Sequence, residues 1–187
     1  MNGRCLAAPL LAMLVACAAA ATTAEPVVHG RVVHVHDGDS FVLQLADGQR
    51  EQVRLAGIDA PEKGQPHADE SRDALRALLH EQRVRVQTIK RDAFGRRVAE
   101  VFRVSDELPE LDAALAQLQA GMAWHFVRYL AEQSPAQQRR YAAAERKARN
   151  GGAGLWREPQ PVPPWEFRTR ARRGVSGSNA SGAPSRT

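Results

Sequence analysis

A series of short strand-forming runs joined by tight turns most constrains what this chain can fold into. Residues 27–35 are rich in valine, and the runs 41–45 and 52–55 alternate in hydropathy, with Asp-Gly dipeptides between the three runs. Asp-Gly favours a hairpin because glycine accepts a positive φ and aspartate hydrogen-bonds within its own turn. The sequence therefore predicts three antiparallel strands in quick succession.

After the third run, the hydrophobic period changes from strand-like to helical. Residues 68–80 place apolar side chains on one helical face, and two further strand patterns follow at 84–89 and 97–104. Helical patterns at 111–120 and 135–149 end near glycines. The order β-β-β-α-β-β-α-α fits a five-stranded oligonucleotide/oligosaccharide-binding (OB) barrel, whose closure removes open strand edges. We therefore predict an α+β protein that is mainly a β barrel, with three helices.

The first 24 residues have the composition of a secretory signal. Arg4 is their one charge, and the apolar run that follows is too short to span a bilayer. Two cleavage sites are open: one near Ala24, and one before Cys17, where the sequence "LVAC" resembles the bacterial lipobox and the cysteine would carry a lipid anchor. Either site implies an exported protein that is secreted, periplasmic or lipid-anchored to the cell envelope.

Cysteine usage limits the chemistry of the remaining chain. Cys5 and Cys17 are the two cysteines of the sequence, and both lie in the signal segment. The body therefore has no disulfide and no cysteine metal site, so any metal must be held by oxygen or by histidine. His34 and His36 alternate on one predicted strand, either as metal ligands or in packing and solvent-facing roles.

The basic charge of the chain belongs mostly to its ends. The formal net charge is +5, yet residues 25–167 hold 20 Lys and Arg against 21 Asp and Glu. We predict one domain over residues 25–168 and a basic tail over 169–187 that is too poor in apolar residues to pack and is expected to be disordered. The arginine cluster at 168–173 either binds nucleic acid or anionic lipid, or is simply solvated.

Carboxylates recur where the predicted strands end. Asp39 lies at the mouth of the first hairpin, and Asp59 and Glu62 follow the third strand on a loop that Pro61 stiffens. If these strands are neighbours, Asp39 and Asp59 converge at the rim of the barrel. Two carboxylates make an open, water-rich site of the kind that suits a hard cation such as Ca²⁺.

Arginines supply the complementary charge. Arg54 lies within the third strand and Arg96 in the turn before the fifth strand. A guanidinium stays charged and matches two phosphate oxygens in a fork geometry. Together with a cation they would stabilise the transition state of attack on a phosphodiester, while Glu62 takes a proton from water.

Six motifs together resemble the staphylococcal nuclease (thermonuclease) family, and in particular its bacterial secreted members. They cover nearly everything from Val28 to Arg168: "DGDS", "VRLAGIDAPE", "FGRRVAEV", "LQAGMAWH", "ARNGGAGLW" and "PQPVPPWEFR". The resemblance implies Ca²⁺-dependent endonucleolytic cleavage of DNA and RNA, with little sugar specificity, that leaves 3′-phosphate ends. It implies a monomer that needs no obligate protein partner.

The resemblance also assigns roles to individual residues. Asp39 and Asp59 would bind Ca²⁺ through their carboxylates and Ala60 through its carbonyl. Glu62 would act as the general base or orient the attacking water. Arg54 and Arg96 would clamp the phosphate, and Asp37 would support the site from behind. An acid role for Arg96 is physically unfavourable because its pKa lies far above neutrality.

Some positions depart from the family pattern. Serine replaces the usual threonine at Ser40, and Phe94 stands where the type member has a tyrosine, which removes a hydroxyl contact to a terminal phosphate. Val127 lies near the place of a second, base-contacting tyrosine, whereas Tyr129 is the best candidate for stacking on a base. These changes affect recognition of the nucleotide end rather than the hydrolytic centre.

Two alternatives to a nuclease remain at this stage. One is a non-catalytic nucleic-acid-binding OB module at the cell envelope, and the other is a lipid-anchored interaction protein. The presence of all five charged candidate residues favours the nuclease. Near the C-terminus, Trp156 and Trp165 are expected to pin the last segment to the barrel.

Overall fold

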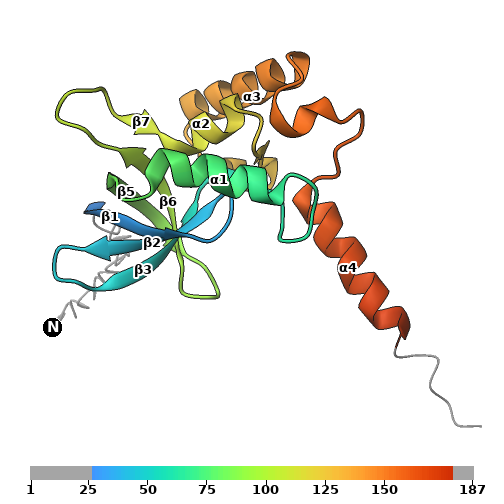
Figure 1. The fold of residues 1–187 in the computed structure, drawn as a ribbon, viewed down its shortest axis with the longest axis horizontal. Coiled ribbons are helices and arrows are strands. Elements are labelled where there is room, and N and C mark those ends of the chain that lie inside the picture. The colour runs from blue at the N-terminus through green and yellow to red at the C-terminus, as the bar shows by residue number, and fades with distance from the viewer. Residues whose placement is uncertain (1–26, 179–187) are drawn as a thin grey trace, which may run out of the picture.

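Five strands close a barrel in the computed structural model, which describes residues 27–178 (Figure 1). The barrel strands are β1 (Val27–Val35), β2 (Ser40–Leu45), β3 (Arg50–Leu55), β5 (Arg83–Arg91) and β6 (Arg97–Arg103). β1 pairs antiparallel with β2 and β5, β2 pairs with β3, and β5 pairs with β6. A parallel pairing of β3 with β6, which sets Arg54 opposite Val98, closes the barrel. The predicted OB-type barrel is confirmed.

The remaining helices and short strands lie outside this barrel. They are β4 (Ile58–Asp59), α1 (Ala68–Leu79), β7 (Leu111–Asp112), α2 (Ala113–Gln119), β8 (Trp124–His125), the 3₁₀ helix η1 (Val127–Glu132), α3 (Pro135–Asn150), the 3₁₀ helix η2 (Gly154–Arg157) and α4 (Pro164–Ser178). In Figure 1, α1, α2 and α3 gather on one side of the barrel, while α4 projects away from the body. β4 and β8 pair with each other and form a second, two-stranded sheet that is separate from the barrel sheet.

Alternating apolar residues of the strands fill the barrel, and α1 covers it. The predicted apolar face of α1 is confirmed, since Leu75 and Leu79 are fully buried. Completely burying one such side chain contributes about 1.5–3 kcal/mol relative to exposure. The strand residues with no more than 1% exposure are Val32, Phe41, Leu43, Val53, Leu55, Val84, Val86, Ala99 and Val101.

The helix that the sequence predicts over 111–120 begins later. Leu111 and Asp112 form β7, which pairs with the end of β6, and the helix starts at Ala113. The Asp112 carboxylate accepts a hydrogen bond from the backbone N–H of Leu115 at 3.0 Å and so caps the first turn. The helix therefore begins two residues later than the periodic pattern predicts.

The C-terminal segment is more regular than its composition indicates. α4 runs from Pro164 to Ser178, so the first ten residues of the predicted tail are helical within the described part of the chain. Proline at the start of a helix is favourable, and an ion pair between Glu166 and Arg170 spans one helical turn. Residues 1–26 and 179–187 lie outside the described residues, and so do the predicted signal, Cys17 and the end of the tail. Between residues 27 and 178, no helix is long and apolar enough to cross a membrane.

Candidate active site

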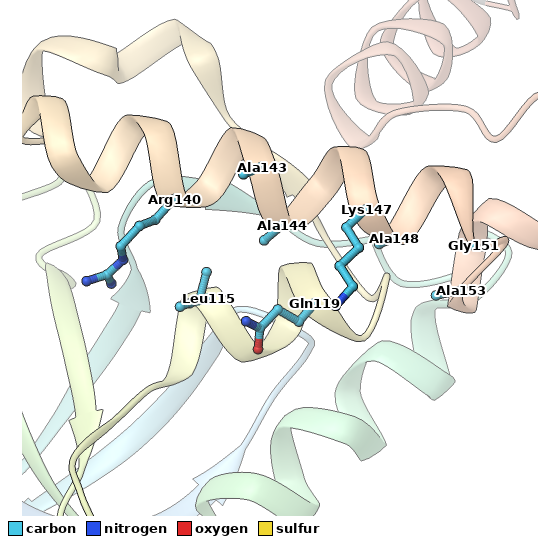
Figure 2. A pocket seen from close by; sticks show the side chains of 9 residues that line it. All are labelled: Leu115, Gln119, Arg140, Ala143, Ala144, Lys147, Ala148, Gly151 and Ala153. Atoms are coloured by element: carbon cyan, nitrogen blue, oxygen red, sulfur yellow. The ribbon is translucent and has the colours of Figure 1, made fainter.

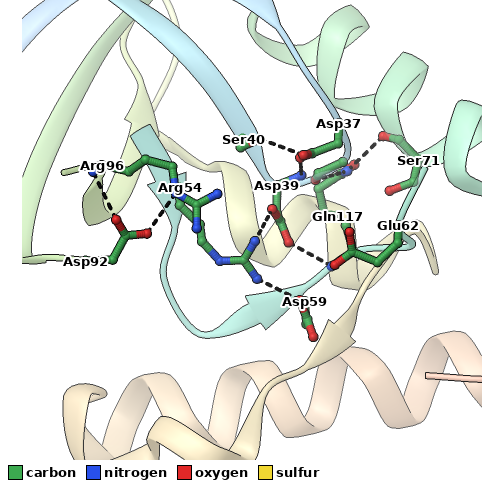
Figure 3. Close-up of polar contacts among 12 residues, drawn as sticks. Asp37, Asp39, Ser40, Arg54, Asp59, Glu62, Ser71, Asp92, Arg96 and Gln117 are labelled. Carbon is green, nitrogen blue, oxygen red and sulfur yellow. Dashed lines mark hydrogen bonds and ion pairs between the residues drawn. The ribbon is translucent and has the colours of Figure 1, made fainter. Parts of the chain in front are cut away.

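The turn between β1 and β2 carries two aspartates with different roles. The carboxylate of Asp37 accepts hydrogen bonds from the backbone N–H of Asp39 at 3.0 Å and from the hydroxyl of Ser40 at 2.7 Å (Figure 3). Asp37 therefore folds the turn, as aspartates do in Asx turns. Asp39 is buried, with 2% of its surface exposed.

The side chain of Gln117 holds this turn against α1. A Cβ atom at Gly38 would lie 1.8 Å from the hydroxyl oxygen of Ser71, so the close approach requires glycine. The buried amide of Gln117 donates to the carbonyl of Gly38 at 2.8 Å and to that of Ser71 at 3.1 Å. Sequence reasoning missed Gln117, because nothing in the pattern of its helix marks two acceptors that lie far away in the chain.

Arg54 joins the two aspartates that the sequence singled out. Its two terminal nitrogens donate to Asp39 and to Asp59, both at 2.6 Å (Figure 3). The other oxygen of Asp39 accepts the backbone N–H of Ala60 at 2.8 Å. Asp59 is held by the β4–β8 pairing, in which it lies opposite Trp124. The structure thus brings Asp39, Arg54, Asp59 and Ala60 together at one end of the barrel.

Burial governs the electrostatics of this group. Burial raises the pKa of Asp39 to about 8; the charge of Arg54 opposes this rise, and the charges of Asp37 and Asp59 add to it. Burial by itself would lower the pKa of Arg54, but the two neighbouring aspartates raise it above its ordinary value, so the guanidinium stays charged. A second cation beside these carboxylates would favour their ionised forms.

Glu62 is contacted by an arginine from the other end of the chain. Arg168 of α4 donates to the Glu62 carboxylate. The same guanidinium donates to the two oxygens of Asp59, at 3.2 and 2.7 Å. The sequence leaves the arginine cluster at 168–173 either in contact with nucleic acid or lipid or simply solvated, but the Arg168 side chain is 31% exposed and lies against two candidate site residues. The signal that could have found it is the motif "PQPVPPWEFR", which ends at Arg168.

Arg96 lies at the start of β6, next to the strand that carries Arg54. Its side chain donates to Asp92 at 2.7 Å, and its backbone N–H donates to the same carboxylate at 3.0 Å. Its guanidinium carbon lies 5.5 Å from the centre of the Phe94 ring. The Nε atom of Arg96 thus holds the side chain to Asp92, and its two terminal nitrogens could contact a phosphate.

The candidate residues for base contact are exposed. Tyr129 of η1 is 45% exposed, and the Lys90 ammonium lies 4.3 Å from its ring centre. Phe94 and Val127, which stand where the family pattern has tyrosines, are 84% and 59% exposed. An exposed aromatic ring next to a cation suits stacking of a base above a phosphate backbone.

The donor set at the acid pair fits a hard cation. In the part of the chain that the structure describes, no group of three or more His, Cys, Asp and Glu side chains could by itself hold a metal ion. Arg54 bridges the carboxylates of Asp39 and Asp59, and these two side chains would be the carboxylate ligands of a cation, with a backbone carbonyl and water completing the shell, as Ca²⁺ accepts. His34 and His36 contact each other edge to face at 4.7 Å and lie outside this group.

A groove between α2 and α3 is a separate feature (Figure 2). Its lining is formed by Leu115, Gln119, Arg140, Ala143, Ala144, Lys147, Ala148, Gly151 and Ala153. The lining contains no carboxylate and shares no residue with the Asp39–Arg54–Asp59 group. The acid pair, rather than this groove, is therefore the candidate active site.

Comparison with known proteins identifies the family. The family model described as "Staphylococcal nuclease homologue" matches residues 52–158, which is more than half of the chain. The chain belongs to this family. The match includes Arg54, Asp59, Glu62 and Arg96, whereas Asp39 lies on the N-terminal side of it.

Individual relatives agree with this assignment. An uncharacterized endonuclease of Escherichia coli O157:H7 is 32% identical over 144 residues, covering 76% of this chain and 86% of the relative. A micrococcal nuclease of Shigella flexneri is 34% identical over 149 residues, covering 76% and 82%. The protein ParB of Escherichia coli is 34% identical over 167 residues, covering 87% and 89%. The chain is therefore an endonuclease of the staphylococcal nuclease family, that is, a phosphodiester hydrolase, and the two non-catalytic alternatives are not supported.

Proposed function

We propose that this endonuclease cleaves both DNA and RNA with Ca²⁺ as its cofactor, with little sugar specificity, and leaves 3′-phosphate ends. The observation that carries the proposal is the bridge that Arg54 makes between Asp39 and Asp59, with 2.6 Å to each carboxylate. Such a group offers both a cation site and a fixed positive charge for an anionic substrate. Glu62 is joined to the same Asp59 through Arg168.

The chain would hold the metal with oxygen atoms alone. Asp39 and Asp59 would contribute carboxylates, and Ala60 would contribute its carbonyl. Bound Ca²⁺ would neutralise charge that develops on the phosphate in the transition state. The N–H of Ala60 already donates to Asp39 at 2.8 Å, which fixes the loop next to the carboxylate.

Glu62 is the candidate for activating water. Its side chain is 38% exposed, so water reaches it, and it sits next to Asp59 through their shared arginine. Its carboxylate would take or orient the proton of the attacking water. Arg54 and Arg96 would stabilise the negative charge on the phosphate, because a guanidinium stays charged in a protein. For the same reason, neither arginine would act as a general acid.

The low sugar specificity follows from which groups the site offers. All five charged candidate residues have a proposed role toward the cation, the phosphate or water, and none is assigned to a ribose hydroxyl. Tyr129 would stack on a base, a contact that tolerates any sequence. Because Phe94 lacks a hydroxyl, we expect recognition of a terminal phosphate to depend more on Arg96 than on the ring.

We also propose that the protein is exported and anchored by a lipid on Cys17. Support comes from the composition of residues 1–24 and from "LVAC". Buried methylenes contribute about 0.8 kcal/mol each to membrane affinity, so more than one acyl chain anchors a protein stably. Fractionation of wild type and Cys17→Ser tests this: the wild type should be in the membrane fraction and the variant should be released. A wholly soluble wild type that begins at Glu25 would contradict the anchor.

Digestion of DNA and RNA by the purified protein tests the proposed function. Cleavage should occur with Ca²⁺, stop in excess chelator and return when Ca²⁺ is restored, more strongly than with Mg²⁺ or Zn²⁺. Mg²⁺ demands tighter octahedral geometry than two aspartates and one backbone carbonyl provide. End-labelled products should carry 3′-phosphates. Undiminished cleavage in excess chelator would overturn the metal-dependent mechanism, although the protein would remain a nuclease.

A further inference from the structure

The segment that leads into α4 is fastened across the loop that carries Glu62. The ring of His67 contacts Glu158 at 3.1 Å, and the side chain of Gln65 donates to the carbonyl of Val162 at 2.5 Å. The ring of Trp165 then packs against Phe126, with 5.6 Å between ring centres. These contacts confirm that Trp165 pins the C-terminal segment, and they aim the next turn of α4 at the acid pair.

These contacts place Arg168 next to Asp59 and Glu62. Its guanidinium makes a two-pronged contact with both oxygens of Asp59, at 3.2 and 2.7 Å, and also donates to Glu62. Arg54 also donates to one of these oxygens, so the Asp59 carboxylate has two cationic partners. Hydrogen bonds to Asp59 and Glu62 raise the pKa of Arg168 above its ordinary value, against the opposing effect of burial.

We propose that Arg168 is a built-in counter-cation that a divalent metal must displace before the site can work. The inference rests on the proposed metal dependence. A metal ion bound to Asp59 would share that carboxylate with the Arg168 guanidinium, and the two carry charges of the same sign. Their binding is therefore mutually unfavourable, and this coupling is reciprocal: what weakens Arg168 strengthens the metal.

Displacement of Arg168 has two consequences in the same structure. Glu62 loses its arginine partner, so its carboxylate is free to accept a proton from water. α4 loses the ion pairs that Arg168 makes with Asp59 and Glu62, while the Trp165–Phe126 and Gln65–Val162 contacts keep the preceding segment in place. Metal binding is thus linked both to freeing the carboxylate of Glu62 and to loosening of α4.

Arg170 provides a matched control on the same helix. Its side chain is 67% exposed and pairs with Glu166 within α4 at 3.4 Å. Arg170→Gln removes the same charge from nearly the same position in the chain, without touching Asp59 or Glu62. Any difference between Arg168→Gln and Arg170→Gln therefore reports the contact rather than the net charge.

Titration calorimetry with Ca²⁺ on metal-free wild type, Arg168→Gln and Arg170→Gln tests the proposal without an activity assay. Arg168→Gln should bind Ca²⁺ roughly tenfold more tightly than wild type, a ratio that corresponds to about 1.4 kcal/mol. Arg170→Gln should bind like wild type. Hydrogen exchange of the 164–173 backbone should quicken in wild type when Ca²⁺ is added, and should already be fast in metal-free Arg168→Gln.

The outcomes distinguish the proposed role of Arg168 from the proposed metal dependence on which it rests. Equal or weaker Ca²⁺ affinity in Arg168→Gln, with binding present in both proteins, would overturn the role of Arg168 and leave the metal site standing. An equal gain in Arg170→Gln would also overturn it, because a general charge effect would then suffice. Absence of binding in all three proteins would overturn the proposed metal site and Arg168 with it.

Discussion

Replacing Gln117 with methionine tests how the fold supports the catalytic turn. The amide of Gln117 donates to the carbonyls of Gly38 and Ser71, and its side chain is 2% exposed. Methionine keeps the length and the volume but cannot donate. A buried acceptor left without its partner costs about 1–3 kcal/mol, and the Ser71 carbonyl, which lies within α1, loses less than that of Gly38. We therefore expect the free energy of unfolding to fall by about 2–4 kcal/mol.

Urea unfolding and thermal melts measure this change. For a protein of this size, the loss corresponds to a drop in Tm of about 6–12 °C. Gln119→Met is the matched control, since Gln119 is on the same helix and is exposed. The turn that Gln117 ties down carries Asp39, so Ca²⁺ affinity should also weaken in Gln117→Met alone. A loss of unfolding free energy below about 0.5 kcal/mol would refute the reasoning that this amide holds the turn.

Two further predictions concern the frame around the site. Burial would raise the pKa of Asp92, but hydrogen bonds from Arg96 and from the Phe94 and Arg96 backbone lower it below its ordinary value. Asp92→Asn should therefore lower the free energy of unfolding at neutral pH. The difference in this free energy from wild type should vanish as the pH falls through the lowered pKa of Asp92. Urea unfolding across pH checks this, and a pH-independent difference would contradict it. At Gly121, φ is +68° and a Cβ would lie 2.2 Å from the Ala153 carbonyl, so Gly121→Ala should cost at least about 2 kcal/mol in thermal melts. Gly151→Ala should be tolerated, because the nearest atom to its Cβ lies at 3.4 Å; equal melting of the two variants would refute the close-approach argument.

The barrel was predictable because its signals are local. Asp-Gly turns, alternating valines and the apolar face of residues 68–80 each depend on neighbours in sequence, and the structure confirms the strands and helices that they indicated. The convergence of Asp39 and Asp59 followed from the order of the strands. The turns, strands and helices are therefore predictable from residues that are close together in the sequence.

The missing parts depend on contacts between distant segments. Arg168 meets Glu62 across 106 residues of sequence, and no local pattern around Arg168 indicates that contact. Gln117 reaches Gly38 across 79 residues, from a helix whose pattern fixes only its apolar face. Short strands such as β4 and β8 have two residues each, too few for any period to be read.

Cleavage of DNA by Glu62→Gln at saturating Ca²⁺ tests the central claim most directly. Glutamine keeps the volume of Glu62 but cannot accept a proton from water, and general-base assistance is typically worth about 10²–10⁴-fold. We predict that kcat falls by that range while Ca²⁺ affinity stays within a few-fold of wild type, and that Glu107→Gln, at an exposed loop position, cleaves normally. Cleavage by Glu62→Gln at the wild-type rate would show that Glu62 is not the base, and the assignment of the hydrolytic centre would be wrong.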